Sequence, residues 1–365
     1  MWFNRMPLED WFDTYQYEIE YDVGESAVKY LSFDELNIDL SKLPLRYGHH
    51  RGRPDLREAI ACQYDGLSAN QVIVTTGASE ANFAVLAALL RPGDHVVVHH
   101  PNYPSLYEVP RSLGCSVSLL SLEFENSFQL DIEKLKRLIT PDTKLISLTV
   151  PNNPTGAMIS EDTLHEIIRI VESNDTFLLF DETYRELTYG TPLPWAASLS
   201  PKIISISSMS KSYGLPGIRI GWMSTQSEAV IEAALAVREQ VTIANSAISE
   251  EIACSVLEKK EKYLRRAREH VRKNLEIVTQ WMSRQESIAW IPPQAGVVCL
   301  PKIIKENIAD PESVYRLLAE TRKTFVIPGR CFEMDNHFFR LGYGGTTKEL
   351  KAGLEIIESV LRDIR

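Results

Sequence analysis

This chain of 365 residues has few cysteines, no long apolar run and no excess of positive charge. Its five cysteines are scattered without a C-x-x-C pair, which favours reduced thiols in a cytoplasmic setting. No apolar run reaches about 18 residues, and acidic residues follow the first few positions, so we expect neither a membrane span nor a signal peptide. The net charge of -10, without a Lys/Arg-rich run, argues against a nucleic-acid partner.

Motifs of three other enzyme classes are also missing. No G-x-G-x-x-G follows the first expected strand, which argues against a dinucleotide-binding oxidoreductase. His165-Glu166 lacks a second histidine at the required spacing, so no metal site is expected. Ser208 and Lys211 have the Ser-x-x-Lys spacing of acyl-serine hydrolases, but the Ser-Asp-Asn and Lys-Thr-Gly elements of those enzymes are absent.

Two regions differ in their pattern. Residues 70–225 alternate short apolar strands with helical patterns, which predicts a mostly parallel α/β sheet. After about residue 245 a long helical stretch at 249–284 is followed by short strands and helices, which predicts a smaller α+β domain that the first 40 residues join. The expected strands are 71–75, 96–98, 145–150, 177–180, 203–207, 218–223, 296–300, 324–327 and 338–341.

Lys211 is the most informative residue. It follows an apolar strand in a Ser/Gly-rich loop that contains Ser208 and Ser210, and Arg219 lies eight positions on. This arrangement suits a lysine that forms a Schiff base, with the hydroxyls and the guanidinium around a phosphate. Pyridoxal phosphate is the cofactor whose chemistry uses such a lysine.

Further motifs at strand ends supply what a pyridoxal phosphate site needs. The turn 76–80 opens a helix and offers backbone N–H groups to an anion, or is an ordinary helix cap. Tyr103 could stack on a pyridine ring or simply pack. Asn153, between the prolines of Pro-Asn-Asn-Pro-Thr-Gly at 151–156, could donate to a phenolate oxygen.

Two charged residues complete the pattern. Asp181 ends an apolar strand, where its carboxylate could pair with a protonated pyridine nitrogen or cap a helix. Arg340 stands in an apolar strand, and a buried guanidinium needs an anion, either a substrate carboxylate or a structural ion-pair partner.

These motifs, in this order, resemble those of the class I/II aminotransferases, which are fold-type I pyridoxal phosphate enzymes. The resemblance covers nearly the whole chain. It implies a large cofactor-binding domain at residues 41–245, with a mostly parallel seven-stranded sheet, and a small α+β domain built from 1–40 and 246–365. It also implies transfer of the amino group of an L-amino acid to a 2-oxo acid through an aldimine at Lys211.

The resemblance assigns a role to each matching residue. Lys211 would carry the cofactor and move the proton, and Asp181 would pair with the pyridine nitrogen. Tyr103 would stack on the ring, while Asn153 and Tyr184 would bond its phenolic oxygen. The implied phosphate ligands are Gly77, Ala78, Ser79, Ser208, Ser210, Arg219 and, from a neighbouring subunit, Tyr47.

The substrate side of the implied site has three residues. Arg340 would bind the substrate α-carboxylate with Asn153 nearby, and the backbone of Gly24 would lie beside the substrate. Because Tyr47 would serve the neighbouring subunit, the resemblance implies a homodimer with shared active sites.

The N-terminus has a narrower resemblance. Pro-Leu-Glu-Asp-Trp at 7–11 and the segments 21–28 and 32–36 are similar to capreomycidine synthases, which close a ring on a hydroxylated arginine by elimination and addition. Tyr184 follows the ordinary aminotransferase pattern instead. Seven acidic residues between positions 9 and 25 suggest a substrate with a cationic side chain, or are surface charges.

Overall fold

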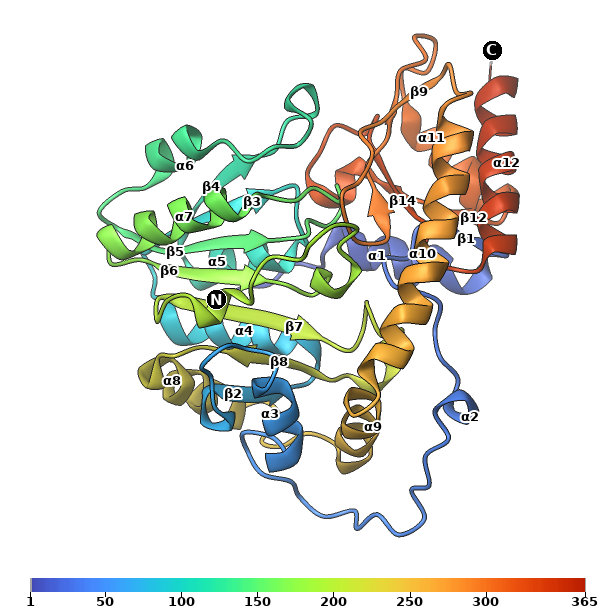
Figure 1. The fold of residues 1–365 in the computed structure, drawn as a ribbon. Helices are drawn as coiled ribbons and strands as arrows, with labels where there is room; N and C mark the ends of the chain where they lie inside the picture. Colours follow the sequence, from blue (N-terminus) through green and yellow to red (C-terminus); the bar gives the residue numbers. More distant parts are fainter. Residues whose placement is uncertain (1, 365) are drawn as a thin grey trace.

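A seven-stranded sheet forms the centre of the larger part of the computed structural model, which describes residues 2–364 (Figure 1). The strand order is β2-β8-β7-β6-β5-β3-β4, and only β8 runs antiparallel to its neighbours. The prediction of a mostly parallel seven-stranded sheet is confirmed. The strands are β2 Val72–Thr75, β3 His95–His100, β4 Ser116–Ser121, β5 Thr143–Thr149, β6 Phe177–Asp181, β7 Ile203–Ser208 and β8 Gly221–Ser224.

Helices cover both faces of this sheet because successive strand residues point to opposite sides. Val96 and Val98 pack with helices α4, α5 and α8, whereas Val97 between them packs with α6 and α7. A further group, α3 and α9, packs around Trp222 of β8. These helices are α3 Pro54–Ala61, α4 Gly77–Leu89, α5 Ser105–Leu113, α6 Ile132–Leu138, α7 Glu161–Ser173, α8 Glu228–Glu239 and α9 Ala247–Leu257.

The smaller part packs the N-terminal segment that contains α1 and β1 against the C-terminal region of the chain (Figure 1). Strand β1 pairs in parallel with β12, and Leu8 and Trp11 lie in the same apolar core as Phe325 and Leu354. The division at residues 40/41 and 245/246 stays a prediction. The elements are α1 Pro7–Tyr15, β1 Tyr21–Asp22, α2 Phe33–Leu36, α10 Lys260–Met282, β9 Ile288–Ala289, β10 Val298–Cys299, β11 Lys302–Ile303, α11 Pro311–Arg316, β12 Thr324–Phe325, β13 Ile327–Pro328, β14 Phe339–Gly342 and α12 Thr347–Asp363.

The helical stretch expected at 249–284 is two helices. Helix α9 ends at Leu257 and α10 begins at Lys260, with Lys259 outside helical geometry (φ -118°, ψ 25°). Neither proline nor glycine stands at this break. The change of direction lets α9 pack on the large sheet's side while Val278 and Trp281 of α10 reach the small-domain core.

Polar side chains fix where several helices begin. Asp131, Ser160, Ser227, Ser246 and Thr346 each accept a hydrogen bond from a backbone N–H in the first turn of the helix that follows. Such caps satisfy donors that the helix itself leaves without partners.

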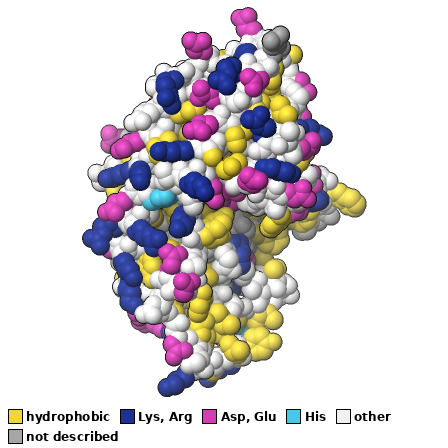
Figure 2. Space-filling model, turned by 90° about the vertical axis from the view of Figure 1, so that its right-hand side faces the viewer, with side chains coloured by type: hydrophobic (Ala, Val, Ile, Leu, Met, Phe, Trp, Pro, Cys, Tyr) yellow, Lys and Arg dark blue, Asp and Glu magenta, His cyan; other side chains and the backbone are white. Residues whose placement is uncertain are grey.

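Within the described residues no helix is long and apolar enough to cross a membrane. On the face in Figure 2, basic and acidic side chains are interspersed.

The segment 22–28 lies directly on the end of β14. An ideal Cβ at Gly342 would stand 2.0 Å from the carbonyl oxygen of Glu25, and one at Gly344 would stand 2.0 Å from that of Ala27. Lys29 N–H donates to the carbonyl of Gly344 at 2.7 Å. The two glycines therefore allow a backbone-to-backbone contact that any side chain would block.

We predict that Gly344→Ala destabilises the protein by about 1–3 kcal/mol, because the atoms that a methyl group would meet are backbone atoms that cannot rotate away. Gly190→Ala is the matched control, since no described heavy atom lies within 4 Å of its ideal Cβ. Urea unfolding of both variants measures the difference. Equal effects at the two positions would contradict the tight contact at residue 344.

Candidate active site

A cavity of about 360 Å³ lies where the carboxyl ends of β5, β6 and β7 meet the small domain. Open α/β sheets bind ligands at this edge. Most of the site residues predicted from the sequence border the cavity, although they come from distant segments. They are Ala78, Ser79, Tyr103, Asn153, Asp181, Tyr184, Ser208, Ser210, Lys211, Arg219 and Arg340.

Lys211 lies in the loop after β7, with its amine held by the N-terminal segment. Its Nζ donates to Glu25 Oε1 and to Ser26 Oγ, both at 3.0 Å. Burial lowers the pKa of the Lys211 amine, but Glu25 and Tyr184 raise it, and the net direction is upward. The free amine is therefore held as an ammonium group.

Asp181 ends β6 and is nearly covered. Its Oδ2 accepts from Asn82 Nδ2 at 3.1 Å, and its Oδ1 accepts from the N–H of Thr183 at 3.0 Å. Burial raises the pKa of Asp181, and the bonds from Thr183 and Asn82 offset only part of that effect. A cation beside it would stabilise the carboxylate.

Sequence reasoning missed Asn82. It stands on α4 and is 3% exposed in a helix whose other buried residues are glycine or apolar. An asparagine among the apolar residues of a helix face predicted to be buried could have indicated it, because buried polar groups need hydrogen-bond partners. Its Oδ1 has no partner among the described residues.

The start of α4 and Arg219 form a site for an anion. Gly77 has φ +76°, and an ideal Cβ there would lie 2.5 Å from Arg219 Nη2. Without that Cβ, the guanidinium can approach the helix N-terminus, and Ser79 borders the same cavity. Ser208 and Ser210 face it from the Lys211 loop. Free N–H groups, hydroxyls and a guanidinium together suit a phosphate.

Arg340 stands on β14 and is 1% exposed. Its Nε and Nη2 donate to the carbonyl of Gly24 at 3.1 and 2.8 Å, and its Nη1 donates to Asn153 Oδ1 at 3.2 Å. Within residues 2–364 no carboxylate lies within ion-pair distance of it. A buried guanidinium with only neutral acceptors is suited to bind a carboxylate that enters the cavity.

Two tyrosines border the cavity in different ways. Tyr103 donates its hydroxyl to Glu9 Oε1 at 2.8 Å, so it is tied to helix α1. Tyr184 is 3% exposed, and its hydroxyl has no partner among the described residues. Burial raises the pKa of Tyr184, while Lys211 and Arg340 lower it. An acceptor or donor inside the cavity would satisfy this hydroxyl.

Three predicted residues do not border the cavity. Gly24 and Gly77 lie behind it, against Arg340 and Arg219 respectively. Tyr47 is 88% exposed in the extended segment between α2 and α3, outside the site of its own chain. The structure thus brings together every predicted side chain except Tyr47.

Helix α1 covers the cavity and separates the acidic residues of the N-terminus. Glu9 and Asp13, one helical turn apart, line the cavity with Phe12. Asp10 instead pairs with Arg5 at 3.0 Å on the surface. Asp22 accepts from the N–H groups of the following turn. Only Glu9, Asp13 and Glu25 of the seven therefore face the cavity.

Comparison with known proteins decides the family. Residues 25–357 match the family model for aminotransferase class I and II. The chain belongs to this family. It is similar to a pyridoxal phosphate-dependent aminotransferase from Streptococcus suis, with 31% identity, a TM-score of 0.94 and coverage of 100% of this chain and 99% of that one.

Two similar proteins are not transaminases by name. The structure of the pyridoxal phosphate-dependent cyclase OrfR has 30% identity and a TM-score of 0.91, with coverage of 100% of this chain and 98% of that one. Capreomycidine synthase from Streptomyces vinaceus is 29% identical over 97% of this chain and 93% of its own length.

The residues of the cavity fit the cofactor of this family, pyridoxal phosphate. A buried carboxylate, Asp181, faces an amine, Lys211, across a cavity that also has an anion site at Arg219. The unpartnered hydroxyl of Tyr184 borders the same space. A ring that carries a basic nitrogen, a hydroxyl and a phosphate would satisfy these groups together.

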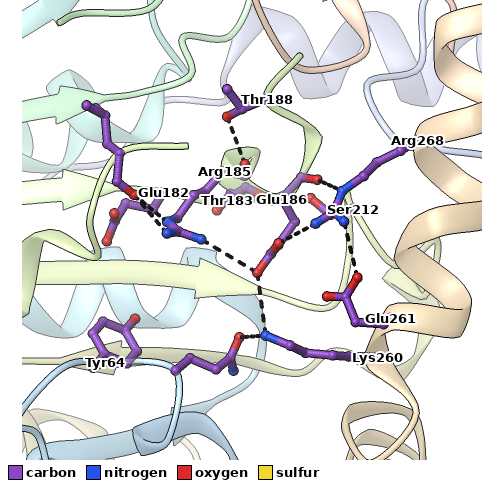
Figure 3. Close-up of polar contacts among 12 residues, drawn as sticks. Tyr64, Glu182, Thr183, Arg185, Glu186, Thr188, Ser212, Lys260, Glu261 and Arg268 are labelled. Atoms are coloured by element: carbon purple, nitrogen blue, oxygen red, sulfur yellow. Dashed lines mark hydrogen bonds and ion pairs between the residues drawn. The ribbon is translucent and has the colours of Figure 1, made fainter. Parts of the chain in front are cut away.

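A second polar layer supports the loop after β6 (Figure 3). Arg268 of α10 donates to the carbonyl and to Oε2 of Glu186, both at 2.8 Å. Ser212, next to the lysine, donates to the carbonyl of Thr183 at 3.1 Å. The aminotransferase loop that follows Asp181 is thereby tied both to the Lys211 loop and to α10.

Glu182 lies in this layer and is wholly buried. It accepts from the N–H of Ala196 at 3.3 Å, and its Oε2 has no partner among the described residues. Burial raises the pKa of Glu182 from 4.5 to about 8, although Ser205 and Arg185 act in the opposite direction. The folded protein therefore binds this proton more tightly than the unfolded chain does.

We predict that the wild type loses stability relative to Glu182→Gln as pH rises from 4.5 to about 8. The loss is about 1.4 kcal/mol per pH unit within this window, and the difference becomes constant above it. Urea unfolding of the cofactor-free protein at several pH values measures it. Glu125→Gln, at an exposed position, is the control. A difference that does not vary with pH would contradict a protonated Glu182.

Proposed function

We propose that this enzyme transfers the amino group of an L-amino acid to a 2-oxo acid, with Lys211 as the residue that carries pyridoxal phosphate. The observation that carries the proposal is the meeting of three groups in one cavity: the Lys211 amine, the Asp181 carboxylate and the Arg340 guanidinium. Lys211 follows β7, Asp181 ends β6 and Arg340 stands on β14. The amine suits attachment of the cofactor, the carboxylate suits its ring nitrogen, and the guanidinium suits the substrate carboxylate.

The cofactor supplies an electron-withdrawing ring to which the substrate nitrogen is joined. Asp181, fixed by Asn82 and Thr183, would hold the ring nitrogen in its protonated state. Tyr103 would pack on the ring, and Asn153 and Tyr184 would bond its hydroxyl oxygen. Ala78, Ser79, Ser208, Ser210 and Arg219 would hold the phosphate beside Gly77.

Arg340 positions the substrate by its α-carboxylate, with Asn153 and the Gly24 carbonyl keeping the guanidinium in place. With the carboxylate fixed there, the substrate Cα faces Lys211. The amine of Lys211, once free, takes the proton from Cα and returns it at the end of the reaction. General acid–base catalysis by a positioned amine has this form.

The acidic lining supports a substrate with a cationic side chain. Glu9 and Asp13 of α1 face the cavity, and Glu25 adds a third carboxylate. Negative charge in a partly buried cavity raises the local concentration of cations and disfavours a second substrate carboxylate. We therefore propose basic amino acids as amino donors in preference to aspartate.

Elimination and cyclisation on a hydroxylated arginine-like substrate is the second candidate. The similarities to capreomycidine synthase and to the cyclase OrfR support it, and the acidic lining suits such a substrate. Both reactions begin with removal of the proton from Cα, so both use Lys211, Asp181 and Arg340. The fate of the nitrogen distinguishes them.

We expect a single turnover of the purified holoenzyme with arginine to convert the cofactor to its amino form and release a 2-oxo acid, which absorbance and mass spectrometry detect. Hydroxyarginine, lysine, alanine and aspartate complete the panel. Return of the original absorbance with a dehydrated or cyclised product would move the enzyme to the second candidate. Equal rates with aspartate and arginine would contradict the cationic substrate.

Lys211→Ala is the control for the whole scheme. Because no other described residue that lines the cavity is a lysine, this variant should bind the cofactor without covalent attachment and should lose turnover. Attachment of the cofactor in this variant would contradict the role of Lys211.

We also propose a homodimer with shared active sites in the cytoplasm. Tyr47 and Leu45 project from the segment between α2 and α3, 88% and 77% exposed. The lower part of the face in Figure 2 has hydrophobic side chains grouped together. A segment that presents apolar side chains to solvent is suited to bury them against a second copy of the chain.

Mixing two inactive variants tests this arrangement. If Tyr47 completes the partner's site, a hybrid of Tyr47→Ala and Lys211→Ala has one intact site, and activity returns when the two proteins are refolded together. Leu45→Ala in place of Tyr47→Ala is the control for effects on association alone. No regain of activity in a verified hybrid, or a single-chain mass in sedimentation, would contradict shared sites.

A further inference from the structure

Glu25 contacts one cation of the site, Lys211, and is influenced by the charge of the other, Arg340. Its Oε1 accepts from Lys211 Nζ at 3.0 Å, and Arg340 contributes to its electrostatic environment. The side chains of Glu25 and Lys211 are 20% and 27% exposed, so the pair lies at the wall of the cavity rather than in open solvent. Apart from the cationic side chain proposed for the substrate, none of the cofactor or substrate groups described above requires a carboxylate here.

The backbone of Glu25 is held in place from several sides. Asp22 Oδ1 accepts from the N–H groups of Gly24 and Glu25 at 2.9 and 2.8 Å. The carbonyl oxygen of Glu25 lies against Gly342 of β14, where an ideal Cβ would stand 2.0 Å from it. Three residues on, the N–H of Val28 donates to the carbonyl of Lys211 at 3.1 Å. The carboxylate therefore has little freedom to leave the amine.

The charges around the amine are defined by four residues. Glu25 and Tyr184 favour the ammonium form of Lys211, Arg340 opposes it, and Ser26 accepts a hydrogen bond from it at 3.0 Å. Burial raises the pKa of Glu25, but the opposing effect of Lys211 and Arg340 is larger, and the net pKa falls to about 2. Glu25 is thus an anion at every pH at which the enzyme would work.

We propose that Glu25 is a positioning residue for Lys211, whose carboxylate holds the amine at the cavity wall in the cofactor-free protein. The inference rests on the role of Lys211 given above. An ammonium group cannot attack a carbonyl carbon, so the pair must release one proton from Nζ before attachment. Glu25 forms no covalent bond; before the cofactor binds, it keeps Lys211 charged and correctly placed.

The test measures the amine itself in the cofactor-free protein. Trace acetylation over a range of pH, with mass spectrometry of the Lys211 peptide, gives the pKa of this one side chain. In Glu25→Gln we expect that pKa to fall by about one pH unit or more, so that Lys211 reacts about tenfold faster at a fixed pH below it. Ser26→Ala should give a smaller fall.

Asp10→Asn is the matched control. It also removes one negative charge from the N-terminal segment, but Asp10 pairs with Arg5 at the surface and does not border the cavity. We expect the pKa of Lys211 to be unchanged in this variant. An unchanged value in Glu25→Gln, or an equal change in Asp10→Asn, would overturn the proposal.

Two further measurements complete the test. Should Glu25→Gln fail to fold, as circular dichroism would show, Glu25→Asp keeps the charge on a shorter side chain and should give an intermediate value; a wild-type value there would count against the proposal. In folded Glu25→Gln, pyridoxal phosphate should attach faster than in the wild type at neutral pH. Failure of the Lys211→Ala control would refute the cofactor role of the lysine without changing the acetylation result.

Discussion

The site depends on the register of three parallel strands. Thr149 of β5 pairs with Asp181 of β6, and Asp181 pairs with Ile206 of β7, so β5 and β6 end at one level and β7 continues only to Ser208. The chain leaves each strand at the same edge and carries Asn153, Asp181 and Lys211 into one cavity. Interstrand hydrogen bonds fix this spacing, which no contact between the three side chains themselves could do as firmly.

The substrate-binding side of the site is supplied by the small domain, which contacts the large domain at the end of the sheet. Arg340 connects β14 to Asn153 of the large domain and to the Gly24 carbonyl of the N-terminal segment. Glu25 then connects the same segment to Lys211. The substrate-binding side therefore joins the cofactor-binding side through a few hydrogen bonds and one ion pair, and the cavity depends on how these two parts of the chain pack.

The sequence was informative where the chemistry is local. Strand ends, the Asn-Pro-Thr-Gly segment and the Lys211 loop could be predicted because each motif is contiguous. The pairing of Asn82 with Asp181 and of Glu25 with Lys211 could not be predicted, since the partners lie 99 and 186 residues apart. Strand β4 was missed because serines at 116, 118 and 121 weaken its pattern, and it forms by pairing with β3. The break between α9 and α10 has no local signal, because packing on two different cores produces it.

Asp181 and Glu182 show what the alternation of one strand can do. The first accepts from Asn82 on one side of the sheet, and the second accepts from Ala196 on the other, so two adjacent carboxyl groups have different surroundings. One can act as an electrostatic partner while the other remains an uncharged acid in a dry interior. A shift of this strand by a single residue would exchange the two environments, placing Glu182 at the reaction centre and Asp181 in the core. Correct pairing of β6 is thus also the step that decides which carboxyl group is chemically useful.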